Sequence, residues 1–241
     1  MSRLLPTLCV LLSALLPLAG QTDPDRESSR KPGRSAWFAC TSIPDGLENP
    51  TKVMAGGKIT QVELPRYMTS DPVKIPPDGI IRIVREEIGE GDPAEVEIVV
   101  LAEARIPEDV REALIILIPL PEPEGDRILS AQVQDLANFK GGDRMFINLS
   151  KTGIRVQLGD SKVTVAPKKA EIYEAPNLSK PTNIPIMYSF YHPERKEWKI
   201  LSASTVVLRP TRREINVFNE GSRLGKIKKH KILFPLPVEN P

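Results

Sequence analysis

Residues 154–165, IRVQLGDSKVTV, decide the fold class of this chain. Ile154, Val156 and Leu158 alternate with polar residues, which is the period-two pattern of a strand with one buried face. Gly159-Asp160 then forms a two-residue turn, since both residues tolerate the positive φ that hairpins require. The alternation resumes over residues 162–165. We therefore predict a β-hairpin here and a β-rich chain around it.

The same pattern extends in both directions. Residues 192–195 and 219–222 are two further hairpin turns by composition, and the apolar run 114–118, LIILI, is typical of a strand buried on both faces. The 24 prolines interrupt the chain too often for long helices. Residues 107–113, PEDVREA, are the one segment that favours a helical turn or two.

An internal repeat indicates how these strands are grouped. Residues 93–106 align with 193–206 at a constant offset, and WFACTS (37–42) aligns with MFINLS (145–150). We predict an all-β protein of two tandem β-sandwich domains, immunoglobulin-like in type, at 36–121 and 144–241. A connector rich in proline and acid, 122–143, joins them. The alternative is one larger sandwich with chance similarity.

The N-terminus has the layout of a secretory signal peptide. Arg3 precedes an apolar stretch, 4–19, after which polarity rises abruptly. A membrane anchor is the competing interpretation, but the stretch is short and Pro6 and Pro17 interrupt it. We expect residues 1–20 to be cleaved before Gln21, 21–35 to be a disordered leader, and the mature chain to be exported, periplasmic or extracellular, without membrane insertion.

The side chains that usually carry catalysis are sparse. His192 lies in an expected turn and His230 in the run KIKKHK, and Gly-x-Ser-x-Gly is absent. Cys9 lies in the expected signal peptide and is removed with it, so Cys40 is the single thiol of the expected mature chain. Cys40 stands in an apolar run, which predicts a buried and unreactive thiol. Cys-x-x-Cys, calcium-loop and P-loop patterns are also absent. We expect no catalytic residues, no cofactor, no metal and no enzymatic activity.

Charge is unevenly distributed along the chain. Residues 86–126 hold 13 acidic residues against two arginines, and residues 209–231 hold eight basic residues against two glutamates. We expect the two regions to attract each other, either docking one repeat on the other or joining molecules head to tail. The candidate contacts for an anion or a partner are Arg223, Lys226, Lys228, Lys229 and Lys231. They suit a solvated or subunit-docking edge, or an anionic polymer held by counterion release. Nucleic acid is disfavoured, because few aromatics interleave the run.

Three blocks carry a resemblance to a known group: WFACTSIPDGLENP, FINLSKTGIRVQLGDSKVTV and LRPTRREINVFN. They resemble uncharacterised exported proteins of Verrucomicrobia-type bacteria, and the resemblance implies a Gram-negative periplasm but no activity. Residues 75–83, IPPDGIIRI, resemble a region of periplasmic pilus chaperones more faintly. The paired cleft arginine and lysine of that family have no identifiable match here.

These observations together favour an exported, non-enzymatic structural or protein-interaction module of the cell envelope. Its expected partner is an envelope protein or a second copy of the chain. The alternatives are a periplasmic chaperone or carrier that adds a partner's strand to its own edge, and a binder of an anionic envelope polymer.

Overall fold

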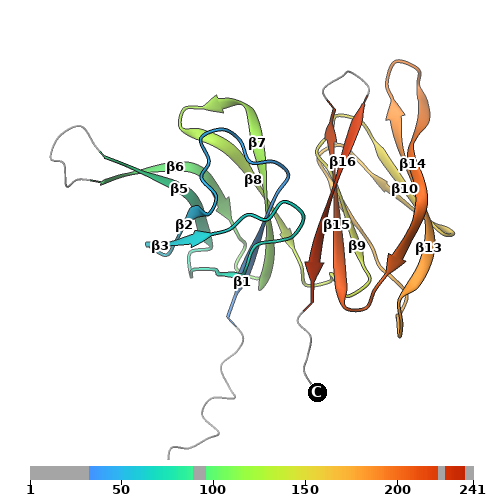
Figure 1. Cartoon of the computed structure of the whole chain (residues 1–241), viewed down its shortest axis with the longest axis horizontal. Coiled ribbons are helices and arrows are strands. Elements are labelled where there is room, and N and C mark those ends of the chain that lie inside the picture. The colour runs from blue at the N-terminus through green and yellow to red at the C-terminus, as the bar shows by residue number, and fades with distance from the viewer. Residues whose placement is uncertain (1–32, 89–95, 222–225, 237–241) are drawn as a thin grey trace, which may run out of the picture. The chain divides into compact units, whose positions relative to one another are not determined.

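The computed structural model describes residues 33–88, 96–221 and 226–236, which form sixteen strands in four four-stranded sheets (Figure 1). The expected signal peptide, 1–20, and most of the expected leader lie outside the described residues. The leader's last residue, Ser35, already begins the first strand. Gly33–Pro241 form one compact unit.

The first eight strands make one sandwich. Its sheets have the orders β4-β1-β7-β8 and β3-β2-β5-β6, antiparallel throughout except that β1 pairs parallel with β7. The strands are β1 (Ser35–Cys40), β2 (Thr51–Ala55), β3 (Lys58–Val62), β4 (Val73–Lys74), β5 (Ile80–Ile88), β6 (Val96–Arg105), β7 (Glu112–Glu124) and β8 (Arg127–Asp135).

The last eight strands repeat this arrangement. The sheets β12-β9-β15-β16 and β11-β10-β13-β14 have the order of the first sandwich with each strand moved on by eight, and β9 pairs parallel with β15. The strands are β9 (Arg144–Asn148), β10 (Ile154–Leu158), β11 (Ser161–Val165), β12 (Ala170–Tyr173), β13 (Thr182–His192), β14 (Glu197–Leu208), β15 (Arg212–Glu220) and β16 (Ile227–Pro235).

The all-β, two-sandwich class predicted from the sequence is therefore confirmed, with a different strand order from the expected immunoglobulin type. An immunoglobulin constant domain pairs its first strand with its second and groups its third, sixth and seventh strands. Here the first strand lies between the fourth and the seventh. The hairpin at 154–165 forms as predicted, with Gly159 at φ 52° between β10 and β11.

Two local expectations are wrong. Residues 107–111 form no helix, because Arg34 binds their carbonyl oxygens: its Nε donates to Val110 O at 2.8 Å and a second nitrogen donates to Pro107 O. The supposed connector 122–143 contains the end of β7 and all of β8. Its one proline, Pro123, is tolerated because the β7–β8 ladder is irregular between Pro119 and Glu124.

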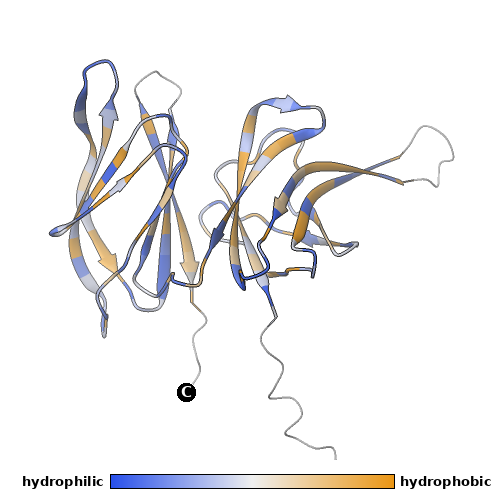
Figure 2. Cartoon of the chain, turned by 180° about the vertical axis from the view of Figure 1, so that it is seen from behind, coloured by the Kyte–Doolittle hydropathy of each residue, from blue (hydrophilic) through white to orange (hydrophobic). Residues whose placement is uncertain are grey.

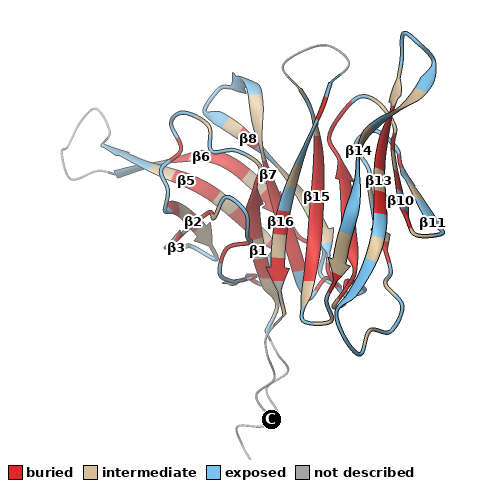
Figure 3. Cartoon of the chain, turned by 45° about the vertical axis from the view of Figure 1, so that its right-hand side comes forward, coloured by how far each residue is buried: buried red, intermediate tan, exposed pale blue. Residues whose placement is uncertain are grey.

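Strand β7 is buried on both faces, as LIILI predicted, and its two faces belong to different cores (Figures 2 and 3). Ile115 and Leu117 point into the first sandwich. Leu114 and Ile116 belong to an apolar layer that they share with residues of β9, β15 and β16, which include Met145, Ile147, Ile215, Val217, Ile232 and Phe234. The second sandwich has its own interior around Phe146, Tyr188 and Phe218. An apolar layer thus joins the two sandwiches.

Candidate functional site

Strand β16 carries most of the predicted contact residues. Lys228, Lys229 and Lys231 lie on it and are exposed, as is Lys226 just before it, whereas Arg223 lies outside the described residues. Side chains alternate along a strand, so the run is divided between two faces. Lys228 shares its face with Ile232 and Phe234 of the apolar layer, whereas Lys229 and Lys231 share theirs with Ile227 of the second interior. The lysines therefore do not form one continuous patch.

The outer edge of β16 borders a groove with a volume of about 1090 Å³. We call it the basic groove. Its charged lining comprises Arg66 from the first sandwich, Lys151, Lys168, Lys228 and Lys229 from the second, and a single carboxylate, Glu220. His230 also lines it. Lys228 and Lys229 were predicted from the sequence, whereas Arg66, Lys151 and Lys168 were missed, since each is an isolated cation in its own segment.

The charges in the basic groove are only partly compensated. Glu220 accepts a hydrogen bond from the backbone nitrogen of Lys151 at 3.1 Å, and Lys168 Nζ donates to Leu149 O. None of the groove's arginine and lysine side chains makes an ion pair with any other described residue. The groove therefore presents five cations and one carboxylate to solvent.

His230 fastens the edge of β16 to the first sandwich. Its Nε2 lies 2.8 Å from Arg66 O, and its ring stacks on Tyr67 at 5.7 Å between centroids. Nearby, Leu233 N donates to Tyr67 O at 2.8 Å. This histidine is therefore used in a structural contact between the two sandwiches.

The interior of the second sandwich holds a buried polar network. Arg144 and Glu214 form an ion pair between parallel neighbours β9 and β15. Asn216 Nδ2 donates to Glu214 Oε1 at 3.4 Å, and Tyr188 OH donates to Asn216 Oδ1 at 3.4 Å. Burial raises the pKa of Tyr188 to about 12. Because Arg144 neutralises Glu214, the carboxylate is held in a structural pair.

Lys229 closes this network at the β16 edge. Its Nζ lies 3.9 Å from the centroid of the Tyr188 ring, although the residue as a whole is exposed. Desolvation of the ammonium end lowers the pKa of Lys229, and the nearby charge of Glu214 opposes that effect. One predicted contact residue is thus partly engaged by the protein itself.

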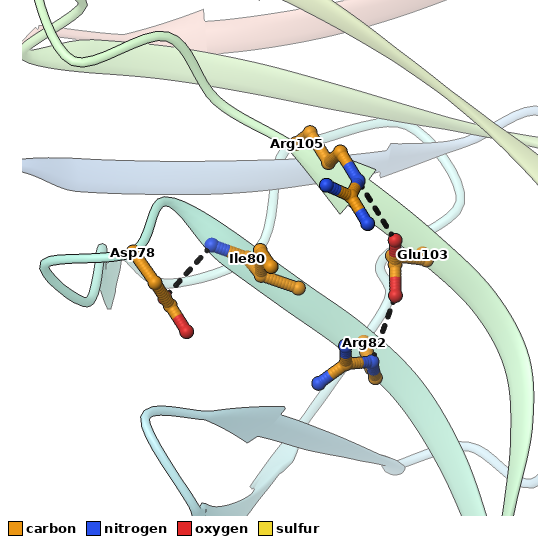
Figure 4. A network of polar contacts seen from close by, with 5 residues as sticks. All are labelled: Asp78, Ile80, Arg82, Glu103 and Arg105. Atoms are coloured by element: carbon orange, nitrogen blue, oxygen red, sulfur yellow. Dashed lines mark hydrogen bonds and ion pairs between the residues drawn. The ribbon is translucent and has the colours of Figure 1, made fainter.

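Among the described residues, the acidic region forms no ion pair with the basic run of the same chain, so these charges do not dock one repeat on the other there. Its carboxylates bind arginines of their own sandwich. Glu103 accepts hydrogen bonds from Arg82 at 2.9 Å and Arg105 at 3.0 Å, next to the turn in which Asp78 binds the Ile80 nitrogen (Figure 4). Lys52 pairs with Glu86 in the same way. The sandwiches meet through apolar side chains instead.

Cys40 is buried, as expected for the single thiol of the mature chain. Its Sγ donates to Ser42 O at 2.9 Å, and desolvation raises its pKa. Within the described ranges, no three His, Cys, Asp or Glu side chains are grouped to hold a metal ion. Those ranges also contain no helix long and apolar enough to cross a membrane.

Strand β14 is the second candidate surface. It is an outer strand that pairs with β13 alone. Residues 200–208, ILSASTVVL, contain no charge, proline or glycine, and Ile200 is 66% exposed (Figure 3). Its free backbone groups and uncharged side chains make it an open edge.

No family model matches this chain, and no curated protein matches it.

Proposed function

We propose that this chain is an exported, non-enzymatic protein-interaction module of the cell envelope, which associates with a second copy of itself through the edge of β14. Export is supported by the apolar stretch 4–19 behind Arg3. A non-enzymatic role is supported by what the reactive side chains do: Cys40 is buried, Glu214 is paired with Arg144, and His230 is used in a contact.

The observation that carries the proposal is the contrast between β14 and the other edge strands. Strand β4 has two residues, β12 has four with Glu171 exposed, and β3 and β11 are short and carry exposed lysines, Lys58 and Lys162. Strands β6 and β8 lie beside each other and cover each other's edges. Strand β16 carries lysines and is bonded to Tyr67. These are the usual protections against edge pairing, and β14 lacks them from Ser202 onward, after the β-bulge at Leu201.

The sequence of β14 also suits pairing with itself. In an antiparallel pair with Thr205 on the two-fold axis, residues 202–208, which follow the β-bulge at Leu201, lie opposite one another, so no charge meets a like charge. Such an isologous contact closes after two chains.

Sedimentation velocity of the exported chain tests the proposal. The wild type is expected to dimerise, and Thr205→Lys to be monomeric, since it places a like-charge pair within the two-fold contact. Thr164→Lys is the matched control, because Thr164 is exposed on β11 at the opposite edge of the same sheet. It is expected to dimerise like the wild type.

A wild type that stays monomeric into the millimolar range refutes self-association. That result would favour the alternative function, in which β14 pairs with a strand of another envelope protein, as the edge strand of a chaperone or carrier does. Equal dimerisation of Thr205→Lys and the wild type would show that a different surface is used.

A further inference from the structure

We infer that the basic groove is a binding site for a phosphate-bearing polymer. The inference does not rest on the proposed function, because no residue that lines the groove belongs to β14. Its starting point is the charge of the lining, five cationic side chains against one carboxylate, in a groove of about 1090 Å³.

The groove's cations come from well-separated parts of the fold. Arg66 lies in the segment that binds the β16 edge, Lys151 and Lys168 follow β9 and β11, and Lys228 and Lys229 lie on β16. Cations spread around a wide groove suit a ligand with several charges along its length, because each charge can meet a different side chain. A single ion would instead need donors that converge on one point.

The composition of the lining suits a phosphate polymer, which carries a charge on each repeat and further oxygens that accept hydrogen bonds. Lysine binds phosphate as a point charge, and arginine binds it through its planar fork. Four of the five cations here are lysines. The groove also contains the neutral polar side chains of Ser42, Ser130 and Gln132, which can donate hydrogen bonds to phosphate or sugar oxygens.

The cations are also available to a ligand. Arg66, Lys151 and Lys228 are exposed and have no carboxylate partner among the described residues. Lys168 and Lys229 are partly engaged, with Leu149 O and the Tyr188 ring. The two freest lysines, Lys151 and Lys228, are therefore the ones to remove.

Binding of fluorescent polyphosphate, followed by anisotropy across a salt series, tests the inference. We compare the wild type with Lys151→Gln/Lys228→Gln and with the control Lys162→Gln/Lys180→Gln, which removes the same charge from exposed lysines outside the groove. The groove variant is expected to bind roughly tenfold more weakly, and its salt dependence to fall by about one unit of slope per lysine removed. The control is expected to match the wild type.

Three results would overturn the inference. The first is that the wild type fails to bind polyphosphate at low salt. The second is that both double variants lose affinity equally, which would mean that net charge and not the groove attracts the polymer. The third is that another anion displaces the labelled polyphosphate as effectively as unlabelled polyphosphate does. If orthophosphate does so at equal phosphate concentration, the groove is a single-ion site. If polyglutamate of equal length does so, the ligand is an acidic protein segment.

Discussion

The buried pair of Arg144 and Glu214 offers the sharpest test of how the second sandwich is held together. Both side chains are almost fully buried, at 2% and 7% exposure, and they are register partners in the parallel pair β9–β15. Removing one partner leaves the other charge in the interior without compensation, which costs about 3–5 kcal/mol of unfolding free energy. Replacing both with apolar residues of similar volume removes both desolvation penalties.

The surroundings make the two single variants unequal. Lys229 senses the charge of both partners, because Glu214 raises its pKa and Arg144 lowers it. In Glu214→Gln, Arg144 and Lys229 are left as neighbouring cations, so the full cost of about 3–5 kcal/mol is expected. In Arg144→Met, Lys229 partly compensates Glu214, and a smaller loss is expected. Arg144→Met/Glu214→Leu is expected to be close to the wild type.

Urea unfolding of the four proteins measures these differences. The exposed pair Lys52–Glu86 supplies the control, since Lys52→Ala and Glu86→Ala are each expected to change stability little. If the double variant loses as much stability as the two single variants together, the pair is not coupled and the reasoning is wrong.

Three further predictions follow from burial. Leu114→Ala, in the layer between the sandwiches, is expected to lower the unfolding free energy by about 2–5 kcal/mol in urea unfolding, whereas Leu120→Ala, only half-buried, costs less. Tyr188 is expected to ionise near pH 12 in a spectrophotometric titration. Because its pKa is raised in the folded state, it contributes stability below pH 10 that is lost as the pH rises toward 12, and Tyr188→Phe removes that dependence. Cys40 is expected to react with a thiol reagent only when the protein unfolds, and rapid labelling of the native protein would contradict its burial.

What could be predicted from the sequence was local. The hairpin at 154–165 depends on adjacent residues, and the strand at 114–118 on an unbroken apolar run, so both are visible in the sequence. The segment 107–113 was misread because the group that captures its carbonyls, Arg34, lies more than 70 residues away. The connector was misread because Pro123 and the acidic residues around it suggest a loop, yet Pro123 falls where the β7–β8 ladder is interrupted.

The candidate sites divide in the same way. The lysines of β16 stand together in the sequence and were found. Arg66, Lys151 and Lys168 come to the same groove through strand order and through the bonding of 66–69 to β16, neither of which a local pattern records. The open edge of β14 depends on which strand is outermost in its sheet, and that too is a property of topology.

The apolar layer between the sandwiches has a consequence for the order in which the chain is made. The first sandwich has all its strands once synthesis passes Asp135, yet Leu114 and Ile116 still lack the residues that cover them. Ile215 and Ile232 arrive some hundred residues later, with the last two strands of the protein. Until then the growing chain presents an apolar sheet face, the kind of surface that causes partly made proteins to aggregate. A chain released early, after β8, is therefore a fragment with a complete hydrophobic core in its first sandwich and an exposed apolar face outside it. Such a fragment needs a chaperone to prevent aggregation, which the full-length protein does not.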